Sequence, residues 1–176
     1  MSVHALHSLY GGRSARLGVP QADREQVVLT PTWMVEQLRA VEGAISLDPC
    51  TSPDNPVRAR AFCALELGRD GLRRSWRCRG PFYCNPPYSD LQVWLEKALA
   101  EHKRGARGWV LGPVRTQRRW FLPLLRARGV RVFCLAPITF QGHAQTFPGP
   151  LFIAGYGIEV PRLVNARGAP MITGRL

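Results

Sequence analysis

Two segments of the chain place apolar residues at the spacing of a helix. The apolar positions of the first segment are Trp33, Met34, Val35, Leu38 and Val41. Thr30 and Pro31 precede them, and this pair is typical of a helix start, with threonine as the cap and proline in the first turn. The pattern predicts a helix from Pro31 up to Gly43.

The second segment has its apolar positions at Leu91, Trp94, Leu95, Ala98 and Leu99. Ser89 or Asp90 can cap this helix, which we expect to end near Gly105. A third helix is predicted over residues 116–128, where Pro123 should bend it.

Short apolar runs between these helices predict strands. The runs cover residues 44–47, 59–65, 82–84, 108–111, 130–135 and 151–158. Residues 49–58 contain three prolines (Pro49, Pro53 and Pro56) and are predicted to form a loop. Strands that alternate with helices at short intervals are typical of a mainly parallel sheet with helices on both faces. We expect an α/β fold in one compact domain at residues 27–160, with a flexible leader at 1–26 and a C-terminal tail at 161–176.

Composition narrows the classes of protein that fit. The 176 residues and the hydrophobic content of 45% fit one globular domain and exclude disorder throughout. The 24 lysines and arginines against 12 acidic residues give a formal net charge of +12, which favours nucleic acid as a partner. Arginine-rich codon usage would explain why Lys97 and Lys103 are the only lysines, but it would not explain why acidic residues are so few.

The five cysteines contain no Cys-x-x-Cys pair, so neither a metal site nor a disulfide framework is indicated. No apolar run approaches the length of a membrane-spanning helix, and the N-terminal residues lack the pattern of a signal peptide. We expect a cytoplasmic protein with reduced thiols and no membrane partner. The sequence leaves the oligomeric state open.

Asn85, Pro86, Pro87 and Tyr88 follow the strand predicted at residues 82–84, and open α/β sheets bind ligands at the carboxyl ends of their strands. The amino group of a nucleobase is a poor nucleophile because its lone pair is delocalised into the ring. Two acceptors, Asn85 Oδ1 and the carbonyl of Pro86, would stabilise the positive charge that develops as this group attacks a methyl group. Tyr88 would stack on the ring of a base extruded from the duplex.

Other readings of these residues stay open. Asn-Pro and Pro-Pro pairs are also common in turns. Asp48, Pro49 and Cys50 close the first predicted strand at the same edge of the sheet, where a cofactor would face the tetrapeptide. An aspartate at such a position is also a frequent turn or helix cap.

Five groups of residues occur in a fixed order along the chain. They are Thr30-Pro31 with Trp33; Leu47-Asp48-Pro49-Cys50 with Asn55; Asp70-Gly71-Leu72 with Trp76; Cys84-Asn85-Pro86-Pro87-Tyr88 with Trp94; and Arg115-Thr116 with Trp120-Phe121. In this order, from about residue 28 to 158, the chain resembles the phage-type DNA N6-adenine methyltransferases, the phage Dam family.

The resemblance implies a Rossmann-like methyltransferase fold, S-adenosylmethionine as the methyl donor and adenine in DNA as the acceptor. The catalytic residues that it implies are Asn85, Pro86, Pro87 and Tyr88. The cofactor-binding residues would be Thr30, Pro31, Trp33, Asp48, Pro49, Cys50 and Asp70. Contacts with DNA would come from Arg115, Thr116, Arg118 and Arg119. Asp70 also suits a simple Asp-Gly turn, and the arginines also suit a solvated helix face.

The chain departs from the family pattern at two places. No Gly-x-Gly follows Asp48, and Pro137 stands before Ile138-Thr139-Phe140 where a basic residue is expected. Since a separate recognition domain has little room, loops 49–58 and 137–150 are candidates for reading the DNA sequence. Two other functions stay open: methyl transfer to another amino or amide group, such as an RNA base or a protein glutamine, and DNA binding without catalysis.

Overall fold

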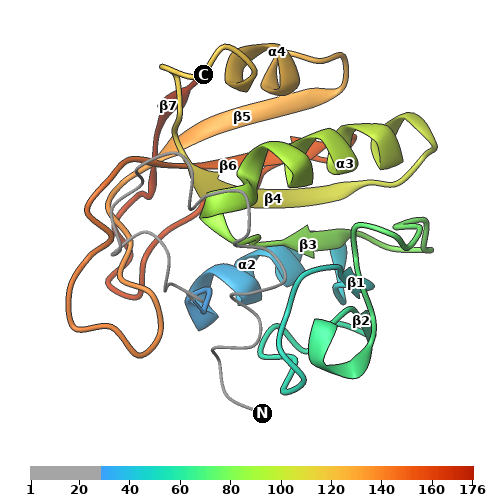
Figure 1. Ribbon diagram of the computed structural model, residues 1–176. Helices are drawn as coiled ribbons and strands as arrows, with labels where there is room; N and C mark the ends of the chain where they lie inside the picture. Colours follow the sequence, from blue (N-terminus) through green and yellow to red (C-terminus); the bar gives the residue numbers. More distant parts are fainter. Residues whose placement is uncertain (1–28) are drawn as a thin grey trace.

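The computed structural model describes residues 29–176, which form one seven-stranded sheet with the strand order β2-β1-β3-β4-β6-β5-β7 (Figure 1). The strands are β1 (Leu47–Asp48), β2 (Ala61–Phe62), β3 (Phe82–Cys84), β4 (Gly108–Pro113), β5 (Val130–Leu135), β6 (Leu151–Tyr156) and β7 (Ile172–Arg175). The strands from β1 to β5 all point the same way, because β6 is antiparallel to both β4 and β5. The predicted α/β fold with a mainly parallel sheet is therefore confirmed. The leader expected at residues 1–26 lies outside the described residues.

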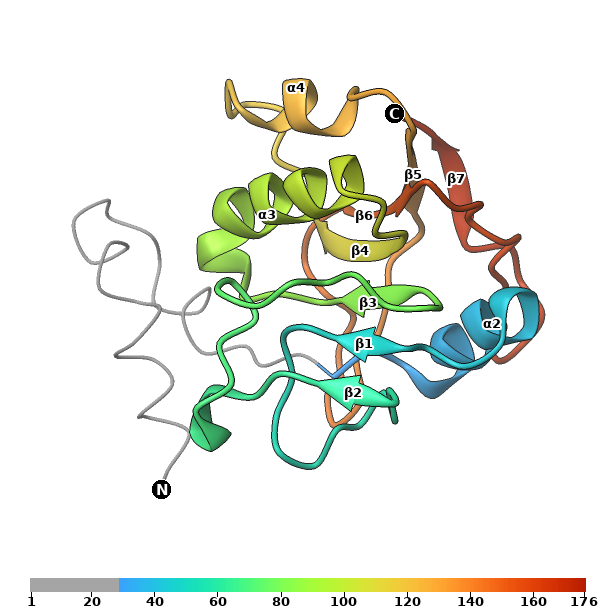
Figure 2. The ribbon, with the colours of Figure 1, turned by 90° about the vertical axis from the view of Figure 1, so that its right-hand side faces the viewer.

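Helices cover both faces of the sheet, as Figure 2 shows. Helix α2 (Thr32–Glu42) packs on one face, and α3 (Leu91–Lys103) and α4 (Phe121–Leu125) pack on the other. Single 3-10 turns, η3 (Leu65–Leu67) and η4 (Tyr88–Asp90), lie in the connections. No helix among residues 29–176 is long and apolar enough to cross a membrane.

Side chains of the central strands alternate between the two faces of the sheet, so the core consists of two clusters, one on each face. Tyr83 of β3 and Trp109 of β4 point into the cluster under α2, whereas Phe82 and Cys84 point into the cluster under α3 and α4. Successive side chains of a strand face opposite sides of the sheet. Because both faces are covered, β3 and β4 are buried along their whole length.

The start of α2 differs from the prediction by one residue. Pro31 stands at the N-cap with extended backbone (φ −58°, ψ 137°), and the helix begins at Thr32 and ends before Gly43. Thr30 therefore does not cap the helix. Its hydroxyl instead forms a hydrogen bond of 2.7 Å with the hydroxyl of buried Tyr83.

The helix predicted over residues 116–128 was too long. Residues 116–120 form turns, and α4 covers Phe121–Leu125 alone. A helix that began at Thr116 would press the ring of Pro123 against the carbonyl of Arg119, and it would leave that carbonyl without a donor. Starting at Phe121 places the proline in the first turn, where its missing N–H costs nothing.

The C-terminal tail expected at residues 161–176 is instead part of the sheet. Strand β7 pairs antiparallel with β5, and Leu163 and Met171 are buried in the cluster under α2. The N–H of Met171 donates to the carbonyl of Leu163, which closes the turn before β7. The apolar residues Leu163, Met171 and Ile172 supply the surface that holds this segment on the domain.

Candidate active site

The connections at β1 and β3 leave the sheet in opposite directions. These strands are neighbours, and the chain passes from β1 to β2 on one side and from β3 to β4 on the other. Ligands of open α/β sheets bind at such a switch point, beyond the carboxyl ends of the strands. Asp48 ends β1 and Asn85 follows β3, so both predicted motifs lie at this point.

The side chain of Asn85 is tied to the start of α2. Its Nδ2 donates to Thr30 Oγ1 at 3.3 Å, and the same hydroxyl pairs with Tyr83. Thr30 and Tyr83 are both buried, so the network lies inside the protein. This contact holds the amide against the segment before α2, and Oδ1, the acceptor atom of the side chain, is itself buried.

The prolines give the segment after β3 a defined path. Pro86 is buried, and Pro87 has φ −55° and ψ 125° before the 3-10 turn at Tyr88. The carbonyl of Pro87 accepts from the N–H of Asp90 at 3.1 Å. Proline restricts its own φ and the residue before it, so the carbonyl directions along Asn85, Pro86 and Pro87 are set by the backbone.

Tyr88 packs against an aromatic residue that sequence reasoning missed. The ring of Phe147 meets the ring of Tyr88 edge-on, with centroids 5.5 Å apart and an interplanar angle of 86°, and Phe147 also contacts Phe140. Burial raises the pKa of Tyr88 well above its ordinary value, against the positive charge of Arg115, which lowers it. The only signal for Phe147 in the sequence is an aromatic residue inside the predicted loop at 137–150.

This loop also contacts the start of α2. Gln141 Nε2 donates to the carbonyl of Thr30 at 2.5 Å, and the N–H of Gln141 donates to the carbonyl of Leu29. A hollow of about 410 Å³ opens in the loop; its lining residues are Phe140, His143, Ala144, Gln145, Thr146, Phe147 and Pro148. The loop therefore lies beside Tyr88 and carries polar groups.

Asp48 begins what we call the β1 loop (Asp48, Pro49 and Cys50). Its side chain is 2% exposed, and Oδ1 accepts from the N–H of Cys50 at 3.0 Å. Burial raises the pKa of Asp48 from 3.8 to about 8, although hydrogen bonds from Cys50 and Thr51 lower it. A buried acid of this kind favours a ligand with a positive charge, because the ligand would stabilise the ionised form.

The other predicted cofactor-binding residues differ in their burial and in their contacts. Pro49 is buried and Cys50 is half-buried, and burial also raises the pKa of the Cys50 thiol. Asp70 closes its own turn, since Oδ1 accepts from the N–H of Leu72 at 2.9 Å, and it pairs with Arg73. Pro31 is buried, whereas Trp33 is half-buried and packs against the cluster under α2.

The predicted DNA contacts follow β4 at the same edge of the sheet. Arg115 is half-buried, and Thr116, Arg118 and Arg119 are exposed in the turns before α4. The N–H of Arg118 donates to the carbonyl of Arg115, which folds the segment back on itself. The positive charge of Arg115 lowers the pKa of Tyr88, so this arginine lies close enough to the catalytic candidates to act on them electrostatically.

The sheet and its switch point, with Asn-Pro-Pro-Tyr after β3, are consistent with a Rossmann-like methyltransferase. The family model described as DNA N-6-adenine-methyltransferase (Dam) matches residues 18–141. The chain therefore belongs to the Dam family, and the family implies methylation of adenine N6 in DNA. No curated protein matches the chain significantly.

Proposed function

We propose that this protein transfers a methyl group from S-adenosylmethionine to N6 of adenine in DNA, with the target base bound by Asn85, Pro86, Pro87 and Tyr88. The observation that carries the proposal is the Thr30–Asn85 contact at the switch point, with the buried Asp48 at the end of the neighbouring strand. This arrangement supports an amide acceptor on one strand end and an acidic site on the neighbouring one.

In the proposed reaction the amino nitrogen of adenine forms a bond to the methyl carbon as the bond between that carbon and sulfur breaks, and the electron pair of that bond stays on sulfur. N6 then loses a proton to water. S-adenosylmethionine supplies an electrophilic methyl group on a positively charged sulfur. Asn85 Oδ1 and the Pro86 carbonyl accept hydrogen bonds from the amino group and stabilise the charge that develops on nitrogen. Tyr88 holds the plane of the base by stacking.

The residues at the β1 loop fit this cofactor. S-adenosylmethionine has no phosphate groups, so the close backbone approach that a Gly-x-Gly loop gives to a pyrophosphate is not required. Its positive charges and hydroxyl donors need acceptors, and Asp48 is an acidic group at the expected strand end. We propose Thr30, Pro31, Trp33, Pro49, Cys50 and Asp70 as further cofactor-binding residues.

DNA would approach the edge of the sheet that carries Arg115, Thr116, Arg118 and Arg119, where the charge of the chain suits phosphate groups. The target base would leave the duplex to reach Tyr88. Loops 49–58 and 137–150 would then contact the neighbouring bases. We expect methylation of this kind to protect phage DNA from restriction.

The test is to incubate purified protein with methyl-labelled S-adenosylmethionine and unmethylated genomic DNA, RNA or protein in parallel. The acceptor is then identified by digestion and mass spectrometry. We expect labelled N6-methyladenine from DNA alone. Label in RNA or in protein glutamine would replace the proposed acceptor, and DNA binding without any label would indicate a catalytically silent relative.

A further inference from the structure

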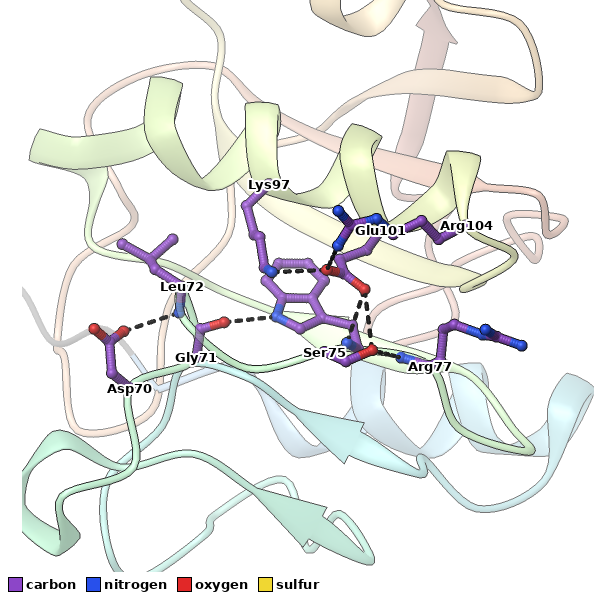
Figure 3. Close-up of polar contacts among 9 residues, drawn as sticks. Asp70, Gly71, Leu72, Ser75, Arg77, Lys97, Glu101 and Arg104 are labelled. Atoms are coloured by element: carbon purple, nitrogen blue, oxygen red, sulfur yellow. Dashed lines mark hydrogen bonds and ion pairs between the residues drawn. The ribbon is translucent and has the colours of Figure 1, made fainter.

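Glu101 is a fully buried carboxylate on the face of α3 that looks toward the segment before β3 (Figure 3). Lys97 Nζ donates to Oε1 at 2.7 Å, and Arg104 Nη1 lies 3.4 Å from the same oxygen. Burial raises the pKa of Glu101, but hydrogen bonds from Lys97 and Trp76 and the nearby positive charges outweigh burial and lower it. The carboxylate therefore stays ionised inside the protein.

The second oxygen of Glu101 holds the backbone at Trp76. Oε2 accepts from the N–H of Trp76 at 3.0 Å and from Ser75 Oγ at 3.4 Å. The indole ring of Trp76 is buried, and it contacts the rings of Trp94 and Phe82 with centroids 6.1 and 5.0 Å away. Both the backbone and the ring of Trp76 are thus fixed against α3 and β3.

Trp76 transmits this restraint to Gly71. Its Nε1 donates to the carbonyl of Gly71 at 2.8 Å, and Asp70 Oδ1 closes the turn by accepting from Leu72 (Figure 3). Gly71 in turn lies directly on the β1 loop: a Cβ atom at Gly71 would stand 1.8 Å from the carbonyl oxygen of Pro49. The backbones of Gly71 and Pro49 are therefore in contact, and only glycine leaves room for it.

The β1 loop has backbone hydrogen bonds to the β2 segment on both sides of Pro49. The N–H of Cys63 donates to the carbonyl of Asp48, and the N–H of Thr51 donates to the carbonyl of Cys63. Pro49 lies between these two bonds, and it is the residue that Gly71 contacts. We propose that Glu101 is a positioning residue for the β1 loop, acting through Trp76 and Gly71 on Pro49. The proposal rests on the assignment of this loop to the cofactor under the proposed function.

The connection can be interrupted at two places. Trp76→Phe removes the Nε1 donor and keeps an aromatic ring, and Glu101→Gln replaces an ionised acceptor with an amide. We expect each change to raise the Kd for S-adenosylmethionine about five- to tenfold, the effect of losing one or two hydrogen bonds. The kcat at saturating cofactor and the KM for DNA should stay within about twofold, because Asn85 and the arginines are untouched.

Two controls separate positioning from stability. Glu96→Gln changes an exposed acid on the same helix, which bonds to Gln92, and should behave as wild type. Leu125→Ala removes a buried side chain of α4 in the same apolar cluster, outside the chain of contacts from Glu101 to Pro49. It should lower the Tm at least as much as Trp76→Phe while leaving the Kd unchanged.

A readout without cofactor keeps the inference independent of the proposed function. Amide hydrogen exchange at Cys50 and Thr51 reports the β1 loop, because these N–H groups bond to Asp48 Oδ1 and to the carbonyl of Cys63. Trp76→Phe and Glu101→Gln should speed exchange there at least fivefold more than Leu125→Ala does. Exchange equal to that of Leu125→Ala would overturn the inference, whereas failure of the wild type to bind S-adenosylmethionine would overturn the proposed function instead.

Discussion

Strands β4, β5 and β6 have six residues each and are paired along their whole length, whereas β1 and β2 have two residues each. The catalytic candidates follow β3, which is paired with β4 over all three of its residues. The β1 loop lies on the other side of the switch point, where backbone hydrogen bonds to Cys63 are combined with the contacts of Trp76 with Gly71 and of Gly71 with Pro49. The proposed acceptor side of the site thus follows a strand that is paired in full, whereas the proposed cofactor side combines a short paired stretch with contacts of individual residues.

Gly71→Ala should produce the largest loss on the cofactor side. The new Cβ atom would stand 1.8 Å from the Pro49 carbonyl, so one of the two backbones has to move. We expect S-adenosylmethionine affinity to fall by more than about 100-fold, as measured by isothermal titration calorimetry. Gly174→Ala in β7 is the matched control, since a Cβ atom there meets nothing within 4 Å. Equal behaviour of the two variants would show that the β1 loop tolerates displacement.

On the acceptor side, the ring of Tyr88 should matter more than its hydroxyl. Stacking of a base on an aromatic side chain contributes about 1–3 kcal/mol, so Tyr88→Ala should slow methyl transfer by about 10- to 100-fold. Tyr88→Phe retains the ring and its contact with Phe147. Single-turnover rates should therefore place Tyr88→Phe within about threefold of wild type, and a Phe variant as slow as Ala would refute stacking as the role of this residue.

The raised pKa of Asp48 predicts that the affinity for S-adenosylmethionine depends on pH. The pKa of Asp48 is raised to about 8 in the folded protein, so the protonated form dominates at lower pH. A cofactor with positive charge binds the ionised form, and its affinity should rise by up to about tenfold per pH unit up to pH 8 and then level off. Asp48→Asn should flatten this profile. A wild-type profile that is already flat would mean that Asp48 does not face the cofactor.

The raised pKa of Asp48 also predicts that the free energy of unfolding falls with rising pH, whereas the cofactor affinity rises. Between pH 4 and 8 the folded state holds a proton on Asp48 that the unfolded state releases, so the free energy of unfolding should fall as pH rises through this range. Asp48→Asn should lose less stability than wild type on going from pH 6 to pH 9, as measured by urea unfolding. A steeper fall in the variant would contradict the raised pKa.

The smallest effect is expected for the exposed arginines after β4. Arg118→Ala should weaken binding to every DNA sequence alike and lower the slope of log affinity against log salt by about 0.9, because one phosphate contact is lost. Arg167→Ala changes another exposed arginine, in the turn before β7, and should leave the slope unchanged. Equal slopes for both variants would place the DNA elsewhere.

Sequence patterns were most informative where one physical requirement dominates. The bounds of β3 and β5 were predicted correctly, since each is an apolar run between turn residues. Asp48 and Asn85 could be assigned to one edge because parallel strands end together. The C-terminal strand was missed because β7 is mostly exposed, so no apolar pattern marks it.

Features that depend on tertiary contacts were not predictable in the same way. Glu101 falls on the apolar face of α3, three residues after Ala98, but nothing local shows that its partner is the backbone of Trp76. Tyr88 and Phe147 are far apart in the sequence, and Phe147 lies in a loop without hydrophobic periodicity, so no local pattern predicts their contact. The local sequence predicted Thr30 as a helix cap, but its hydroxyl instead bonds to Tyr83 and Asn85.

The most direct test of the division between the two sides of the site is single-turnover methyl transfer by Asn85→Ala at saturating S-adenosylmethionine, with the cofactor Kd measured on the same sample. We predict that transfer falls by at least about 100-fold, since an acceptor for the developing charge is lost, and that the Kd stays within a few fold of wild type. A Kd that rises as much as the rate falls would contradict the account, because Asn85 would then support the site as a whole instead of the reacting amino group.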